Sequence, residues 1–244
     1  GGMNMTPVAA ALDKVPIGTW AEYQIKRGEG PPRKLRHALV GKSGSDFVVE
    51  SRNEGPRGKM ITQTTVTNDP AGEGAVKKVI SQMGDQDPME MPLGPPRDKA
   101  GEKPAAGEQR PHHGPGPKMG RGMGRAGGMM GGMNARFLKP DPKALVGKET
   151  VTLAAGTFTA EHYRQTGPRG GTVDFWINKD VGPFGLVKME VDRPGGPDDG
   201  DSGKVTFELS ARGTGAKAEI TKPAKPFDPA AMPGRWGRGP GPKN

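Results

Sequence analysis

The stretch from residue 156 to residue 191 constrains the fold more than any other part of the chain. It reads GTFTAEHYRQTGPRGGTVDFWINKDVGPFGLVKMEV, in which three runs rich in β-branched and aromatic residues are separated by a Gly-Pro turn and a Pro-Phe-Gly corner. Runs of this length between Gly and Pro turns are typical of antiparallel strands. The stretch therefore predicts a three-stranded meander in the middle of an all-β fold.

The same pattern occurs on both sides of this meander. Residues 17–26 alternate between apolar and polar side chains around Trp20, which is the period of a half-buried strand. By the same criteria we expect further strands at residues 34–40, 47–51, 60–67, 148–153, 205–211 and 217–221. Residues 75–83 place apolar side chains at helical spacing, which favours a short amphipathic helix over the alternative of a strand.

Segments of a different composition separate and follow these strands. Residues 84–140 contain 13 Gly and 9 Pro, and such a segment cannot bury enough apolar surface to offset the entropy lost on ordering. We expect one β domain, a curved antiparallel sheet or half-open β-barrel with at most one or two short helices. The predicted organisation is an N-terminal lead at residues 1–14, the β domain at residues 15–83 and 145–221, a disordered insertion at residues 84–144, and a disordered basic tail at residues 222–244.

The net charge of +9 is concentrated in the insertion and the tail. Residues 109–140 carry six Lys or Arg and no acid, and residues 222–244 carry five Lys or Arg and one Asp. Such segments suit an anionic membrane or an acidic partner in an assembly, or they are solvated linkers. Nucleic acid is not favoured, because the Arg-Gly stretch at residues 118–128 lacks the interleaved aromatic residues that stack on bases.

The insertion also carries potential metal ligands. His112, His113, Met119 and Met123 offer imidazole and thioether groups that suit Cu(I). Their spacing forms no regular array, and the competing interpretation is a low-complexity segment with incidental methionine. We predict no metal site and no cofactor.

The ends and the composition bear on the compartment. The chain begins Gly-Gly-Met, contains no cysteine and contains no apolar run of about 18 residues that would span a membrane. A start of this kind is typical of a cleaved, trimmed or tag-derived end, and it is compatible with the removal of an export signal. We expect an exported protein of the periplasm or cell envelope.

Three motifs occur together in the central meander: an Ala-Gly-Thr-Phe-x-Ala strand, a strand with Trp, and a Val-Gly-Pro-Phe-Gly-Leu-Val-Lys corner. Their residues are Ala155, Gly156, Thr157, Phe158, Ala160, Trp176, Val181, Pro183, Phe184, Gly185, Leu186, Val187 and Lys188. Together they resemble the periplasmic lipoprotein-carrier superfamily, over residues 145–221 and, by pattern alone, over residues 15–83. The resemblance implies a half-open β-barrel around an apolar cavity, partly closed by short helices.

In a half-barrel, side chains of the concave face line a cavity if they do not fill its centre. The residues predicted for this role are Trp20, Tyr23, Phe47, Phe158, Tyr163, Phe175, Trp176, Leu186, Met189 and Phe207. The competing interpretation is that these residues only pack the core. His37 and His162 lie in predicted strands without the spacing of a catalytic triad, so we predict no catalytic site and no enzyme activity.

Two classes of function remain. The first is non-catalytic binding of an apolar or amphipathic ligand, such as a lipid or a lipidated protein, in the half-barrel. The second is a structural or interaction subunit of an envelope or surface assembly, with a solid β core and basic docking segments. The sequence predicts neither the ligand nor the oligomeric state.

Overall fold

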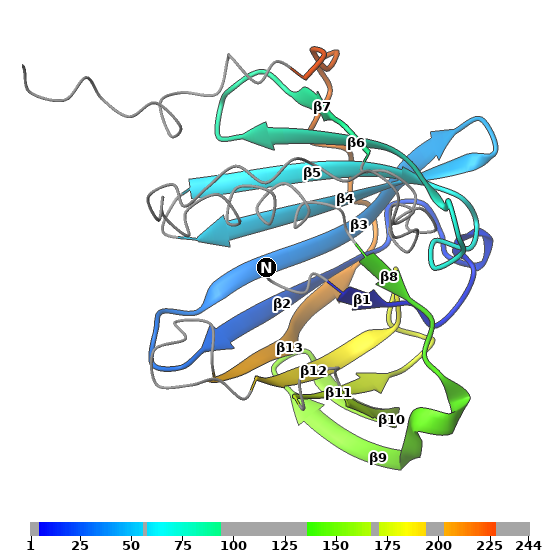
Figure 1. Ribbon diagram of the computed structural model, residues 1–244, viewed down its shortest axis with the longest axis vertical. Coiled ribbons are helices and arrows are strands. Elements are labelled where there is room, and N and C mark those ends of the chain that lie inside the picture. The colour runs from blue at the N-terminus through cyan, green and yellow to red at the C-terminus, as the bar shows by residue number, and fades with distance from the viewer. Residues whose placement is uncertain (1–4, 56–57, 94–135, 167–170, 194–202, 228–244) are drawn as a thin grey trace, which may run out of the picture.

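The computed structural model describes residues 5–55, 58–93, 136–166, 171–193 and 203–227. Their architecture confirms the all-β class, because an 11-stranded antiparallel sheet contains almost all of the regular structure (Figure 1). In sheet order the strands are β7 (Met89–Met91), β6 (Val76–Met83), β5 (Gly58–Val66), β4 (Asp46–Gly55), β3 (Arg33–Ser43), β2 (Trp20–Arg27), β13 (Gly203–Gly213), β12 (Leu186–Arg193), β11 (Thr172–Ile177), β10 (Gly156–Thr166) and β9 (Leu145–Leu153).

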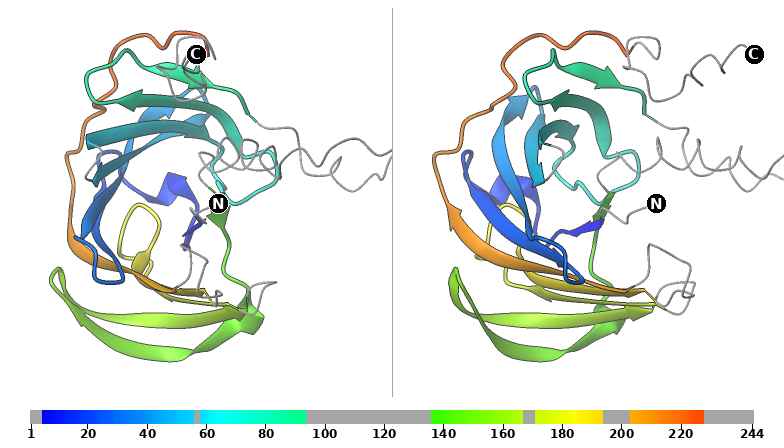
Figure 2. Two further views of the ribbon diagram at one scale, coloured as in Figure 1. Left: turned by 60° about the vertical axis from the view of Figure 1, so that its left-hand side comes forward. Right: turned by 90° about the vertical axis from the view of Figure 1, so that its left-hand side faces the viewer.

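The two halves of the chain join in the middle of this sheet. Strands β2 to β7 form one meander and β9 to β13 form another, and β2 pairs with β13. The sequence of β5 (GKMITQTTV) favours a strand, since it is rich in the β-branched residues that suit a pleated surface. The sheet curls strongly, so that one face is concave and the other convex (Figure 2).

A short two-stranded ribbon fills one end of the concave side. β1 (Met5–Pro7) pairs in parallel with β8 (Arg136–Leu138), and Figure 2 shows both strands inside the curve of the sheet. The single-turn helix η1 (Leu12–Lys14) follows β1, and η3 (Pro142–Ala144) follows β8. We call residues 5–15, residues 136–138 and Phe184 the plug.

The plug is held by apolar packing and by backbone hydrogen bonds. The amides of Val8 and Ala9 donate to the carbonyls of Leu138 and Phe184, over 2.9 and 2.8 Å. The side chains that bury the plug against the sheet form one core, which comprises Val8, Leu12, Leu39, Phe47, Val49, Val66 and Phe184. Because the plug supplies three of these side chains, it is part of the fold and not an appendage.

An extended segment crosses the convex face. Residues 214–225, which we call the strap, run along the outside of the sheet after β13 (Figure 2). The amides of Glu219 and Ile220 donate to the buried carboxylate of Glu50, and the Gln63 side chain bonds both this carboxylate and the Ile220 carbonyl. At the far end, Lys225 exchanges backbone hydrogen bonds with Pro88 and Glu90 on the outer edge of β7.

The strap passes close to Gly18 where it leaves the sheet, and this position requires a glycine. The amide of Ala216 donates to the carbonyl of Gly18, and a Cβ at Gly18 would lie 3.0 Å from the backbone nitrogen of Gly215. Gly18 also has a φ of +89°, a conformation that residues with a Cβ rarely adopt. A larger residue at position 18 would push the strap away from the sheet.

Two sequence-based expectations are wrong. Residues 76–83 form strand β6 and not a helix, because pairing with β5 and β7 satisfies their backbone while Val79 turns into the core. Residues 217–221 form no strand; they belong to the strap, whose partners are mostly side chains. The structure also contains β7, β8 and η3 within the segment predicted as an insertion, while residues 94–135 lie outside the described residues.

The strap anchor makes a first prediction. Replacing Glu50 with Ala leaves the amides of Glu219 and buried Ile220 without an acceptor, and we expect the free energy of unfolding to fall by about 2–3 kcal/mol in urea denaturation. The control is Glu208→Ala, which breaks a part-exposed ion pair with Lys26 and should cost less than about 1 kcal/mol. Equal losses in the two variants would contradict the anchoring role of Glu50.

Candidate functional site

The concave face divides into a plugged end and an open end. Buried at the plugged end and beneath it are five of the residues predicted to line a cavity: Tyr23, Phe47, Phe175, Leu186 and Met189. The Tyr23 hydroxyl donates to the Leu186 carbonyl over 3.0 Å, and burial raises the pKa of this hydroxyl. These side chains pack against one another or against the plug, as core residues do.

Three other predicted residues lie on the opposite face of their strands, and two of them, Phe158 and Trp176, are buried there and join the same hydrophobic core as Tyr23. Trp20 stacks under the Arg36 guanidinium and donates its indole N–H to the Thr214 carbonyl of the strap. Phe158 lies under Arg212, at 5.2 Å from ring centre to guanidinium carbon. Trp176 stacks on His162, with 4.4 Å between ring centroids and 12° between planes. Strand alternation separates these residues from the concave set, since Trp176 and Phe175 are neighbours on β11.

The convex face carries a compact polar cluster around His162. This imidazole is 5% exposed, and its Nδ1 lies 2.8 Å from Glu149 Oε1 while its Nε2 lies 2.7 Å from Asp174 Oδ1. Arg164 donates to the same Asp174 oxygen, and Trp176 donates to Glu149 Oε2. The hydrogen bonds from Trp176 and then from His162 lower the pKa of the Glu149 carboxyl.

This cluster clamps the edge of the sheet. Glu149 lies on β9, His162 on β10 and Asp174 on β11, so the hydrogen bonds tie three neighbouring strands together. The two carboxylates lie on opposite sides of the ring and do not converge on one point. Accordingly, no metal-binding group of His, Asp or Glu occurs in the part of the chain that the structure describes.

Toward the open end, apolar side chains on the concave face are only half-buried. Strand register places them in two cross-strand rows, since directly opposed residues share a face. Met83, Met60, Asn53, Leu35 and Tyr23 make one row, and Ile25, Phe207, Met189, Phe175 and Tyr163 make the other. Six residues that are not fully buried form what we call the open-end surface: Ile25, Leu35, Met60, Met83, Val205 and Phe207.

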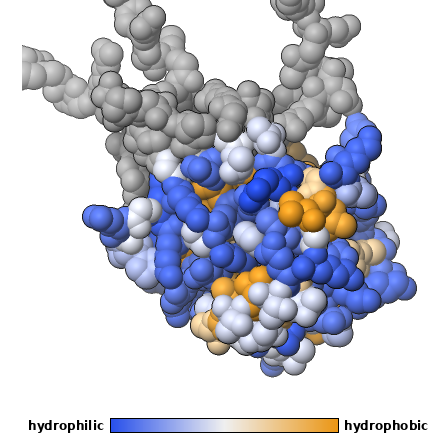
Figure 3. Space-filling model, turned by 90° about the horizontal axis from the view of Figure 1, so that it is seen from below, coloured by the Kyte–Doolittle hydropathy of each residue, from blue (hydrophilic) through white to orange (hydrophobic). Residues whose placement is uncertain are grey.

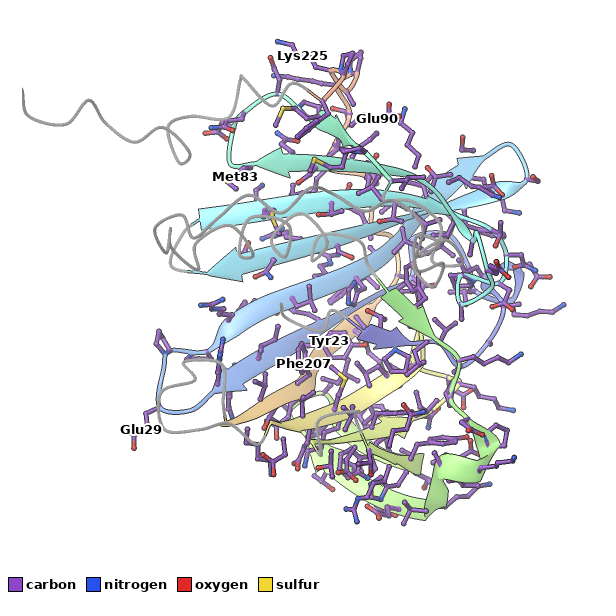
Figure 4. The ribbon with its side chains drawn as sticks, viewed as in Figure 1. Tyr23, Glu29, Met83, Glu90, Phe207 and Lys225 are labelled. Atoms are coloured by element: carbon purple, nitrogen blue, oxygen red, sulfur yellow. The ribbon has the colours of Figure 1, made fainter. Side chains whose placement is uncertain are left out.

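The open-end surface runs from the middle of the sheet to its rim. Figure 4 shows Phe207 near Tyr23 in the middle of the sheet and Met83 at the end of β6, where the side chain is 53% exposed. Two cations continue the same face: Arg27 is opposite Val205, and Arg33 is opposite Ile25. The result is an apolar strip with two guanidinium groups at one end.

A cleft of about 590 Å³ lies at the plug side of β10. Its walls are residues 8–9 and 139–140, strands β9 and β10, and the loop after β11. Apolar groups from Val8, Ala9 and Ile177 line it, together with several charged side chains from exposed positions. We call it the lysine cleft, because Lys139, Lys148 and Lys179 line it from three separate segments.

The surface seen from the β9 side is mostly hydrophilic (Figure 3). Small hydrophobic patches interrupt it, and among the exposed large apolar residues are Leu145 and Val146 of β9, at 46% and 56% exposure. None of the described helices is long and apolar enough to cross a membrane. The half-buried apolar side chains of the open-end surface lie instead on the concave face.

His37 links the plug to the sheet and makes a pH-dependent prediction. It is 7% exposed between Tyr23 and Phe184, its Nδ1 lies 2.8 Å from Ser51 Oγ, and burial lowers its pKa to about 4. In the unfolded chain this histidine has an ordinary pKa near 6.5, so it binds a proton at a higher pH than in the folded protein. The free energy of unfolding is therefore unaffected by this group above pH 6.5, and it decreases by up to about 3 kcal/mol as the pH falls toward 4.

The measurement compares urea unfolding of the wild type and His37→Gln between pH 7 and 4. We expect the wild type to lose more unfolding free energy over this interval than the variant, because the variant lacks the group that titrates. Parallel losses in the two proteins would show that His37 does not take up the proton.

Comparison with known proteins does not assign a family. No family model and no curated protein matches the chain. Among solved structures, it is similar to a crystal structure from Parabacteroides distasonis ATCC 8503 that bears the name putative lipoprotein, with a TM-score of 0.33 and 13% identity over 81% of this chain and 96% of that chain. A likeness this loose carries no argument about function.

Some sequence-based candidates cannot be placed. His112, His113, Met119 and Met123 lie outside the described residues, as do most of residues 109–140 and 222–244. Sequence reasoning missed Arg27, Arg33 and the lysines of the cleft. Strand alternation alone places Arg27 on the face of Tyr23, but the cleft depends on how three distant segments pack, which no local pattern reports.

Proposed function

We propose that the half-barrel is a non-catalytic binding protein that holds an amphipathic ligand with an acyl chain on the open-end surface. The observation that carries this proposal is the continuity of the two cross-strand rows. Apart from Asn53, the row residues beyond the place where the plug ends are apolar, so the fold keeps a half-exposed hydrophobic strip that its own described residues do not bury.

The charge at one end of the strip favours an anionic head group. Arg27 and Arg33 extend the rows at Val205 and Ile25, on the concave face. A guanidinium group binds a carboxylate or phosphate through paired hydrogen bonds. A fatty acid or an anionic lipid would place its chain along Phe207 and Leu35 and its head group at these arginines.

The proposal includes an exported protein near an envelope membrane, where such ligands occur. The sequence resemblance to lipoprotein carriers and the basic segments at residues 109–140 and 222–244 support this setting. Both arguments come from the sequence, and they agree with the ligand chemistry suggested by the open-end surface.

The burial of Tyr23, Phe47, Phe175 and Met189 favours the second class of function, an interaction subunit with a solid core. In that case the apolar strip would be covered by another protein in an assembly. The two classes differ in whether purified protein binds a small amphipathic molecule by itself.

A pair of neighbouring substitutions tests the ligand proposal. Phe207 and Thr206 are adjacent on β13 and lie on opposite faces, so Phe207→Gln alters the strip and Thr206→Gln alters the convex face. We expect wild-type protein to bind a dansyl-labelled fatty acid, and Phe207→Gln to weaken this binding about 10-fold or more, as the loss of a buried aromatic contact implies.

Thr206→Gln should leave the affinity unchanged, and circular dichroism should show that both variants are folded. A wild-type protein that fails to bind the labelled fatty acid would overturn the ligand proposal in favour of the interaction subunit. Equal effects of the two variants would overturn the placement of the ligand on the concave face.

A substitution of Arg33 tests the head group. Arg33→Gln should weaken the binding of dodecanoate by about 3- to 10-fold, because a charged hydrogen bond is lost, and should leave the affinity for dodecanol unchanged. Isothermal titration calorimetry measures both ligands on the same protein. Equal losses for the acid and the alcohol would contradict a head-group role for Arg33.

A further inference from the structure

The lysine cleft lies apart from the open-end surface, and its chemistry differs. Its volume of about 590 Å³ is within the range of small-molecule sites in proteins. Buried Phe175 and Met189 lie between the cleft residue Tyr163 and Phe207 in the cross-strand row. An acyl chain on the open-end surface therefore does not extend into the cleft through this row.

Three lysines from segments far apart in the sequence line the cleft. Lys139 follows β8, Lys148 is on β9, and Lys179 belongs to the loop after β11. Elsewhere, lysines such as Lys26, Lys78 and Lys204 form ion pairs with carboxylates. Among the described residues, no carboxylate lies within ion-pair distance of the three cleft lysines, so their charges remain available to a ligand.

The acidic residues of the cleft do not cancel this charge. Glu161 and Asp180 also line it, which leaves an excess of one positive charge. Glu161 Oε2 accepts a hydrogen bond of 2.8 Å from the Tyr163 hydroxyl. Burial, followed by the bond to Glu161, raises the pKa of Tyr163 to about 12, so the hydroxyl keeps its proton at neutral pH.

We propose that the lysine cleft binds a small phosphate monoester, with Lys139, Lys148 and Lys179 around the phosphate. Lysine is an effective point-charge partner for phosphate, and the excess positive charge of the cleft favours an anionic group. The free oxygen of Glu161 and the carboxylate of Asp180 then accept hydrogen bonds from hydroxyl or amine groups on the ester. This chemistry occurs in a free phosphate ester and in the head group of phosphatidic acid.

The experiment titrates the full chain with glycerol phosphate and measures the binding by calorimetry at low salt. We expect binding with a dissociation constant below roughly 1 mM, and a loss of about 10-fold or more in the triple variant Lys139→Gln, Lys148→Gln, Lys179→Gln. All three lysines are exposed, so the variant should remain folded. The control is Lys14→Gln, Lys77→Gln, Lys217→Gln, which removes the same charge from exposed positions elsewhere.

The control variant should bind within about twofold of the wild type, since general attraction to a basic protein is not site binding. Failure of the wild type to bind, or equal losses in the two triple variants, would overturn the proposed site. These outcomes are independent of fatty-acid binding at Phe207, so the two proposals fail separately.

A second arm distinguishes the sources of the phosphate. If the source is a lipid, vesicles with phosphatidic acid should bind the wild type better than the cleft triple variant, and glycerol phosphate should compete. If the source is a free ester, glycerol phosphate should bind while the two proteins sediment equally with the vesicles.

Discussion

A strongly curved sheet has a concave apolar face that its own strands cannot cover. Here the cover is the plug, in which Val8, Leu12 and Phe184 pack against side chains of β3, β4 and β5. The plug is short, and it closes only one end of the curve. The same feature that completes the hydrophobic core therefore leaves the open-end surface half-exposed, and it also forms one wall of the lysine cleft.

The two edges of the sheet are stabilised by different contacts. The strap reaches β7 and adds backbone hydrogen bonds through Lys225, which covers an edge that would otherwise invite pairing with another chain. At the other edge, β9 is joined to β10 and β11 by the side-chain cluster around His162. Glu50 on β4 and Glu149 on β9 thus have similar roles, because each uses a carboxylate to gather donors from a separate segment.

The sequence was sufficient to predict the β class and most of the strands, because alternation and turn residues are local signals. It failed at β6, where Val76, Val79 and Ile80 match a helical spacing as well as a strand, and only pairing with β5 decides between them. Strand alternation along β11 could have predicted that Phe175 and Trp176 lie on opposite faces of the sheet. The burial of Phe47 could not have been predicted, since it depends on a plug that brings together residues 5–15, residues 136–138 and Phe184 from distant parts of the chain.

The central claim is that an amphipathic ligand binds where the plug ends, and methionine side chains report on this place. Met60 and Met83 belong to the open-end surface, whereas Met189 is buried beneath it. The most direct measurement is NMR of methyl-labelled methionine during titration with dodecanoate, with assignments from single Met→Leu variants. The account predicts that the Met60 and Met83 methyl signals shift and saturate together. Unchanged signals from these two residues at saturating ligand would contradict it.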